Sequence, residues 1–165
     1  MAAKMKSMWR PASAPIVVGV LLVLIGFASF STAAEAPNPD QRVVTTMTAK
    51  QLKTVLGEQG YLGVKISDKG HVEFHVEGVP VTLFIAKDHT SIMTYAGWTG
   101  TNADLNKVNE WNKNNNYSRA YIDDEGDPII ELDLVFKGGV TIAHVKDFLS
   151  TVKLSVNKFA SFLSQ

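Results

Sequence analysis

Two histidines and a glutamate alternate along one short segment of the sequence, as His71, Glu73 and His75. In a β-strand, side chains two residues apart point to the same face, so these three side chains could coordinate a single zinc ion. A closed zinc site needs about four ligands, and no spacing in the chain brings His89 or His144 to this segment. We therefore predict the solvent-facing side of a half-buried strand, with no metal and no cofactor.

The other patterns that could carry chemistry also point away from catalysis. The run from Asp123 to Asp127 is rich in carboxylates, but it is too short for a calcium loop and fits an ordinary hairpin turn. The sequence has no cysteine, which excludes thiol catalysis. It also has no Gly-x-Ser-x-Gly motif for an activated serine. The sequence therefore predicts a protein that is not an enzyme.

Asparagines recur at every third residue beside a tryptophan, with Asn106, Asn109 and Asn112 flanking Trp111. On a helix this stripe could form hydrogen bonds to a protein partner or to a carbohydrate. A buried amide must be paired, so the same residues could instead fix the helix against neighbouring strands. We favour the structural interpretation and keep Asn109, Trp111 and Asn112 as candidate binding residues.

Three aromatic residues form a second candidate site. Trp98, Trp111 and Tyr121 could line a small-molecule pocket between a helix and a sheet. Side chains of this kind more often belong to the core or to a sheet face. Core positions are therefore the expected outcome, and Trp98 and Tyr121 join the candidate binding residues.

The elements that must position these residues follow an export signal. Three basic residues precede an apolar run from Ile16 to Phe30, and small residues come after it. This pattern is typical of a secretory signal peptide over residues 1–36. The small residues allow cleavage after Ala33, Ala34 or Ala36. We therefore expect a periplasmic protein without stable membrane insertion.

The alternative is an uncleaved N-terminal segment that anchors the protein in the inner membrane. The apolar run is short for this role, because a membrane span needs about 20 apolar residues. Residues 37–46 contain prolines and polar side chains without a sustained pattern, and they are predicted to form a linker. The folded domain is then expected over residues 47–165.

Capping signals mark the expected helix starts. Thr48 and Gln51 form a capping-box pair, and Thr101 with Asp104 matches the same pattern. Thr141 precedes the longest run of apolar residues at steps of three and four. We therefore predict helices that begin at Thr48, near Thr101 and at Thr141. Alternation and turn residues predict strands at 62–67, 71–77, 79–86, 91–98, 117–123 and 128–136.

The order of these elements, α-β-β-β-β-α-β-β-α, predicts the fold class. The turns between the first four strands are short, so those strands must pair antiparallel, because parallel pairs need long crossovers. The sequence therefore predicts an α+β two-layer sandwich, in which helices cover one face of an antiparallel sheet. Leu105, Val108 and Trp111 are expected to face the core, whereas Glu131 and Asp133 are expected on the solvent-facing side of the last strand.

Charge narrows the range of partners. The chain carries 16 basic and 16 acidic side chains, and removal of residues 1–36 would leave a slightly acidic domain. Such a domain lacks the positive surface that nucleic acid or an anionic membrane requires. We therefore expect neither of these partners.

Five blocks of the sequence, in their order along the chain, resemble the YbjN-domain family of bacterial sensory transduction regulators. They are GVPVTLFI at 78–85, LNKVNEWN at 105–112, YSRAYID at 117–123, GDPIIELDL at 126–134 and GGVT at 138–141. The resemblance covers about residues 52–162, and it implies a fold similar to that of type III secretion chaperones. It implies no catalytic residue, and it adds Arg119 to the candidate binding residues. The export signal departs from the usual cytoplasmic members of the family.

Two functions fit these observations. The first is an exported, non-enzymatic interaction or regulatory module that binds a protein or peptide, or a second copy of the chain in a homodimer. The alternative is a periplasmic sensor of a small molecule, with its pocket between the second helix and the sheet.

Overall fold

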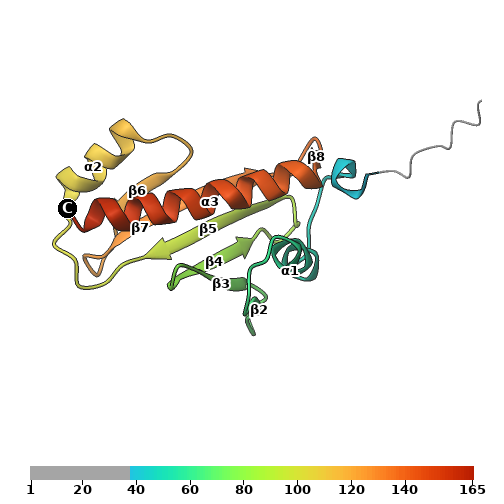
Figure 1. Ribbon diagram of the computed structural model, residues 1–165, viewed down its shortest axis with the longest axis horizontal. Coiled ribbons are helices and arrows are strands. Elements are labelled where there is room, and N and C mark those ends of the chain that lie inside the picture. Colours follow the sequence, from blue (N-terminus) through green and yellow to red (C-terminus); the bar gives the residue numbers. More distant parts are fainter. Residues whose placement is uncertain (1–37) are drawn as a thin grey trace, which may run out of the picture. The chain divides into compact units, whose positions relative to one another are not determined.

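A six-stranded antiparallel sheet forms the centre of residues 38–165, which are the residues that the computed structural model describes (Figure 1). Its strands lie side by side in the order β2-β3-β4-β5-β7-β6. They are β2 (Lys65–Ile66), β3 (Val72–Val76), β4 (Val79–Ile85), β5 (Ser91–Gly97), β6 (Arg119–Ile122) and β7 (Pro128–Val135). The predicted signal peptide lies outside the described residues.

Three α-helices accompany the sheet: α1 (Ala49–Glu58), α2 (Leu105–Asn114) and α3 (Ile142–Leu163). Helix α3 runs across one face of the sheet with α1 beside it, and α2 lies next to β6 and the C-terminal end of α3 (Figure 1). Apolar side chains from α1 and α3 form one core with the strand residues that point toward them. The predicted α+β sandwich is confirmed. No helix in residues 38–165 has the length and apolar character needed to span a membrane.

Capping explains where the helices start. The Thr48–Gln51 capping box forms as predicted, with the Gln51 amide donating to Thr48 Oγ1 at 3.3 Å. The prediction for α2 is wrong by three residues, because Asp104 rather than Thr101 caps it, with Asp104 Oδ1 accepting from the Lys107 amide at 2.9 Å. Leu105 is consequently 72% exposed instead of facing the core.

The N-terminal part of the described chain contains structure that the sequence analysis did not predict. A one-turn 3-10 helix, η1 (Pro39–Gln41), precedes the short strand β1 (Val43–Val44). This strand pairs antiparallel with β8 (Val140–Thr141), directly before α3. The predicted linker thus contributes one of the two strands of a small second sheet. Strand β2 is also shorter than predicted, since Gly63 adopts a φ of 68° and interrupts the extended chain.

A two-residue hairpin joins β3 to β4, and it provides a stability prediction. Glu77 and Gly78 both have positive φ, 48° and 89°, as a type I′ turn requires. Asparagine tolerates this conformation better than glutamate. We expect Glu77→Asn to raise the free energy of unfolding by about 0.5–1 kcal/mol. The substitution loses only a long, exposed ion pair between Glu77 and Lys153.

Urea denaturation measures this change. Glu77→Ala is the matched control, because it removes the same ion pair without relieving the positive φ, and it should not stabilise the protein. Equal stabilities of Glu77→Asn and Glu77→Ala would contradict the explanation.

Candidate functional site

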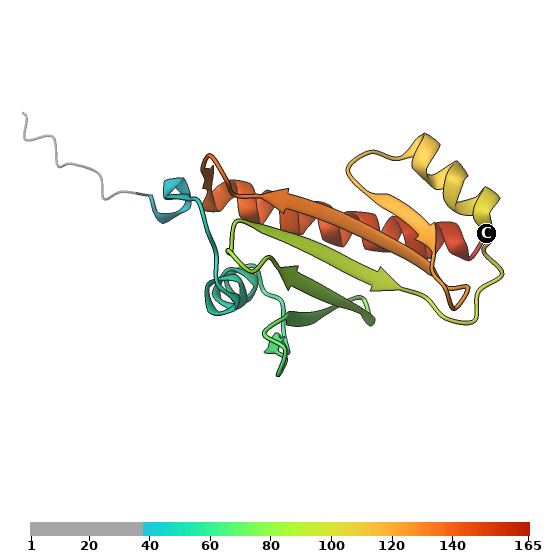
Figure 2. The same cartoon turned by 180° about the vertical axis from the view of Figure 1, so that it is seen from behind.

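One face of the six-stranded sheet is not covered by any helix of residues 38–165, and Figure 2 shows the molecule from this side, with the strands in front of α3. We call it the open face. Its side chains alternate with the core residues along each strand, and the strand register places them in rows. The open face includes Lys65, His71, Glu73, His75, Thr82, Phe84, Met93, Tyr95, Arg119, Tyr121, Ile129, Glu131 and Asp133.

An aromatic and apolar strip crosses the centre of the open face. Phe84 lies opposite Met93 on the neighbouring strand. The rings of Phe84 and Tyr95 pack edge-on, with their centroids 6.2 Å apart. Ile129 is only 1% exposed, although no helix of the described chain lies over it. Gly97 makes this possible, because a Cβ atom there would lie 2.7 Å from the Ile129 side chain. These residues form a small apolar layer on the side of the sheet away from the main core.

The predicted histidine segment lies beside this strip. The ring of His71 packs edge-on against the ring of Phe84, with the centroids 4.6 Å apart. Glu73 and His75 are exposed farther along β3. Within residues 38–165, no group of three or more His, Asp or Glu side chains is arranged to hold a metal ion.

A cluster of polar side chains occupies the β6–β7 side of the open face. Arg119 Nε donates to Glu131 Oε2 at 2.7 Å, and Arg119 Nη1 donates to Asp133 Oδ2 at 3.1 Å. The Tyr121 hydroxyl donates to Glu131 Oε1 at 2.8 Å. Glu131 lies on the predicted side of β7, but it is only 6% exposed, so the prediction that it faces solvent is wrong. A carboxylate this buried must be paired, and Arg119 and Tyr121 supply the pairing.

The same cluster produces a pH-dependent prediction. Burial, together with the hydrogen bond to Glu131, raises the pKa of Tyr121 from 10.0 to about 12. The folded protein therefore holds this proton more tightly than the unfolded chain. The resulting stabilisation is complete below pH 10 and is lost as the pH rises through about 12. We expect ultraviolet titration to show one tyrosine that ionises near pH 12.

Tyr121→Phe is the matched variant for this titration, since it keeps the ring and removes the phenol. The latest transition should disappear in Tyr121→Phe while the earlier ones remain. An unchanged latest transition would show that Glu131 and Tyr121 are not paired as described.

Asn112 connects α2 to the edge of the sheet. Its Nδ2 donates to the Ala120 carbonyl and its Oδ1 accepts from the Ala120 amide, both at 2.8 Å. Ala120 belongs to β6, the outer strand of the sheet, so the amide takes the place that a further strand would occupy. This arrangement is the one expected of a structural asparagine. Asn109 is also exposed on α2, but it makes no such bonds to β6.

The three aromatic candidates lie on two sides of the sheet. The rings of Trp98 and Trp111 both contact Phe159 of α3 edge-on, at 5.2 and 4.9 Å, on the helix-covered side. Trp111 Nε1 also donates to Ser118 Oγ at 3.1 Å. Tyr121 is on the open face, so these three side chains do not line one pocket. Of the candidate binding residues, the structure brings Arg119 and Tyr121 together on the open face.

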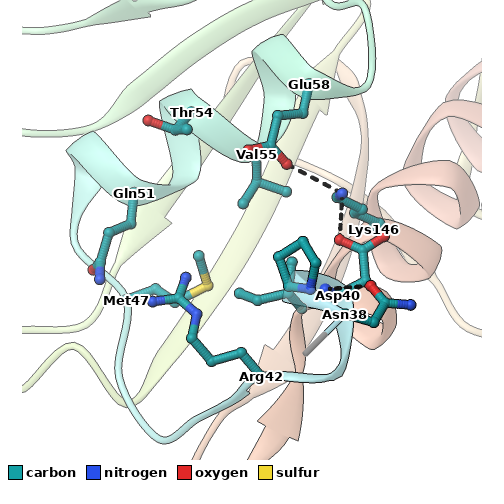
Figure 3. Close-up of a pocket in the computed structure, with 11 residues that line it drawn as sticks. Asn38, Asp40, Arg42, Met47, Gln51, Thr54, Val55, Glu58 and Lys146 are labelled. Carbon is teal, nitrogen blue, oxygen red and sulfur yellow. Dashed lines mark hydrogen bonds and ion pairs between the residues drawn. The ribbon is translucent and has the colours of Figure 1, made fainter. Parts of the chain in front are cut away.

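A cavity that the sequence analysis missed lies between η1, α1 and the start of α3 (Figure 3). Its volume is about 390 Å³. Lys146 Nζ lies 2.6 Å from Asp40 Oδ1 and 3.1 Å from Glu58 Oε2 at one wall. The hydrogen bonds to Asp40 and Glu58 raise the pKa of Lys146. No local pattern could have revealed this site, because its residues come from two distant parts of the sequence, 38–58 and 142–146.

Comparisons with known proteins agree with this fold. Residues 48–165 match the model of the YbjN family, described as "Putative bacterial sensory transduction regulator". A similar solved structure is the type III secretion chaperone SycH of Yersinia pestis, in complex with a stable fragment of YscM2. The similarity covers 70% of this chain and 98% of the chaperone chain, with 15% identity and a TM-score of 0.50. A search of curated proteins found no match.

Proposed function

The chain belongs to the YbjN family, and from this premise we propose that it is a non-enzymatic interaction module that binds another protein through the open face. Both the regulatory description of the family and the chaperone-like fold support a role in binding rather than in catalysis. The signal-peptide pattern at residues 1–36 supports a periplasmic location. An anchor in the inner membrane is the alternative.

The observation that carries this proposal is the apolar strip on the open face. Phe84 of β4 lies opposite Met93 of β5, and Tyr95 is two residues farther along β5. All three side chains are only partly buried, although the sheet has a complete core on its other side. A partly exposed apolar strip on an uncovered sheet face is the kind of surface at which proteins bind partners. Methionine suits such a surface, because its flexible side chain adapts to different partners. The strip therefore offers a place for apolar side chains of a partner.

The sheet edge at β6 is not free for β-strand addition, another mode by which proteins bind peptides. A peptide can extend a sheet by pairing with the free backbone groups of an edge strand. At Ala120 the Asn112 side chain already occupies those groups. A partner is therefore expected to lie across the open face rather than to add a strand beside β6. The solved complex of the SycH chaperone with a protein fragment supports the idea that such a fold can hold a protein segment.

Site-specific photo-crosslinking in cells tests this proposal. A photoreactive residue at position 93 lies on the open face, and one at position 154 is the matched control, because Leu154 is 59% exposed on α3. We expect position 93 to give a defined protein adduct that position 154 does not give. No adduct at position 93, or the same adducts at both positions, would contradict binding through the open face.

A small-molecule sensor is the second candidate function, and the cavity beside Lys146 favours it. Met47, Val55 and Ile142 line the cavity together with polar residues. A ligand at 100 times its dissociation constant would stabilise the fold by about 2.7 kcal/mol. A thermal-shift screen of metabolites, repeated on Thr54→Trp to fill the cavity, tests this idea. Stabilisation of the wild type alone would support it, and no stabilisation or equal stabilisation of both would contradict it.

A further inference from the structure

We infer that the protein segment bound by the open face carries basic residues beside its apolar ones, and that these meet the β6–β7 end of the sheet. This inference rests on the proposed function and specifies the chemistry of the partner. It follows from the distribution of charge around the apolar strip.

The β6–β7 end of the open face has far more carboxylates than cations. Arg119 is the one basic side chain among the open-face residues and hairpin residues of β6 and β7, and it is already paired with two carboxylates. The hairpin between the two strands adds four acidic residues. These are Asp123, Asp124, Glu125 and Asp127.

The turn itself requires only one of these acidic residues. Asp123 Oδ1 accepts from the amides of Glu125 and Asp127, at 3.0 and 2.8 Å, and so holds the turn in place. Asp124 and Glu125 are exposed at its tip. Their charges are therefore presented on a turn that Asp123 holds in shape, and their acidity is not explained by the geometry of the hairpin.

The negative potential of this end reaches the apolar strip. Burial raises the pKa of Tyr95, and the charges of Asp123, Glu125, Glu131 and Asp127 raise it further. A partner side chain beside Tyr95 would experience the same field. The β2–β3 end of the open face is different, since Lys65, His71 and His75 accompany Glu73 there. The charge therefore also gives the partner a direction, with its basic part toward the hairpin.

A segment that combines apolar and basic side chains matches this surface in both respects. Its apolar groups cover Phe84, Met93 and Tyr95, while its lysines or arginines approach Asp124 and Glu125. Such complementarity speeds association and depends on salt, because exposed charges are screened over about 8 Å at physiological ionic strength. An anionic membrane surface would be repelled by the same carboxylates.

Selection from a phage-displayed library of random peptides, carried out on the full-length protein, tests the inference. The peptides obtained are measured by fluorescence anisotropy against three variants. Met93→Ser/Tyr95→Ser removes the apolar strip, and Asp124→Asn/Glu125→Gln neutralises the tip of the hairpin. The control Glu110→Gln/Asp147→Asn makes the same change of charge on exposed positions of α2 and α3.

We expect selected peptides rich in lysine or arginine that lose binding to the Met93→Ser/Tyr95→Ser variant. Their affinity for the hairpin variant should fall about tenfold, with a smaller loss at high salt, and should be unchanged for the control. Peptides whose affinity depends on Met93 and Tyr95 but not on Asp124 and Glu125 would overturn this inference and leave the proposed function standing. Peptides whose affinity does not depend on Met93 and Tyr95, or a selection that yields no binding peptide, would overturn both this inference and the proposed function. Self-association through Met93, detected by sedimentation, would replace the inferred partner with a second copy.

Discussion

Phe159→Ala is expected to lower the free energy of unfolding by about 3–5 kcal/mol, the largest effect of any single substitution considered. Phe159 is fully buried, and its ring lies between those of Trp98 and Trp111. It therefore joins α3 to the end of β5 and to α2. Removing the ring leaves a cavity bordered by two large rigid side chains, which cannot collapse to fill it.

Phe162→Ala is the matched control for this prediction. Phe162 is on the same helix and its ring also contacts Trp111, but it is only partly buried, so less apolar surface is lost. Chemical denaturation monitored by tryptophan fluorescence measures both variants. A loss of less than about 1 kcal/mol for Phe159→Ala, or equal losses for the two variants, would show that this contact does not hold α2 and α3 together.

Asn112→Ala is expected to cost about 2 kcal/mol and to release α2 from the edge of the sheet. The substitution removes two hydrogen bonds to the backbone of Ala120, which is itself buried. The partly buried amide and carbonyl of Ala120 would then lose their protein partners, and each lost hydrogen bond costs about 1 kcal/mol. Release of α2 would also expose β6 as a free edge, which favours aggregation.

Asn109→Ala is the matched control, because it changes the same residue type on the exposed side of the same helix. Its stability should stay within about 0.5 kcal/mol of the wild type. Hydrogen exchange at the Ala120 amide should accelerate in Asn112→Ala and remain unchanged in Asn109→Ala. Equal exchange in the two variants would contradict the structural role of Asn112.

The elements with strong local signals could be predicted from the sequence. The Thr48–Gln51 capping box and the apolar steps of α3 were sufficient to place two helices. The start of α2 was missed because both Thr101 and Asp104 can cap a helix, and the sequence does not show which side chain reaches a free amide. Strand β1 was missed because its two residues pair with β8, almost a hundred positions away.

The candidate site was only partly predictable, for a physical reason. Period-two alternation correctly placed Glu131 and Asp133 on one side of β7, but it could not show that Arg119 and Tyr121 bury Glu131. That contact requires the pairing of β6 with β7. The same pairing separates Tyr121 from Trp98 and Trp111, which lie on the helix-covered side. Asn112 was identified, and the favoured interpretation of it as a structural residue agrees with its two hydrogen bonds to Ala120.

Methionine methyl NMR tests the central claim of binding through the open face most directly. Residues 38–165 contain two methionines, Met93 on the open face and Met47 in the core beside α1. Their methyl signals can be assigned with Met93→Leu and observed while the crosslinked partner, or the selected peptide, is added. Binding should shift or broaden the Met93 signal and leave the Met47 signal unchanged. Binding that leaves the Met93 signal unchanged would contradict the account.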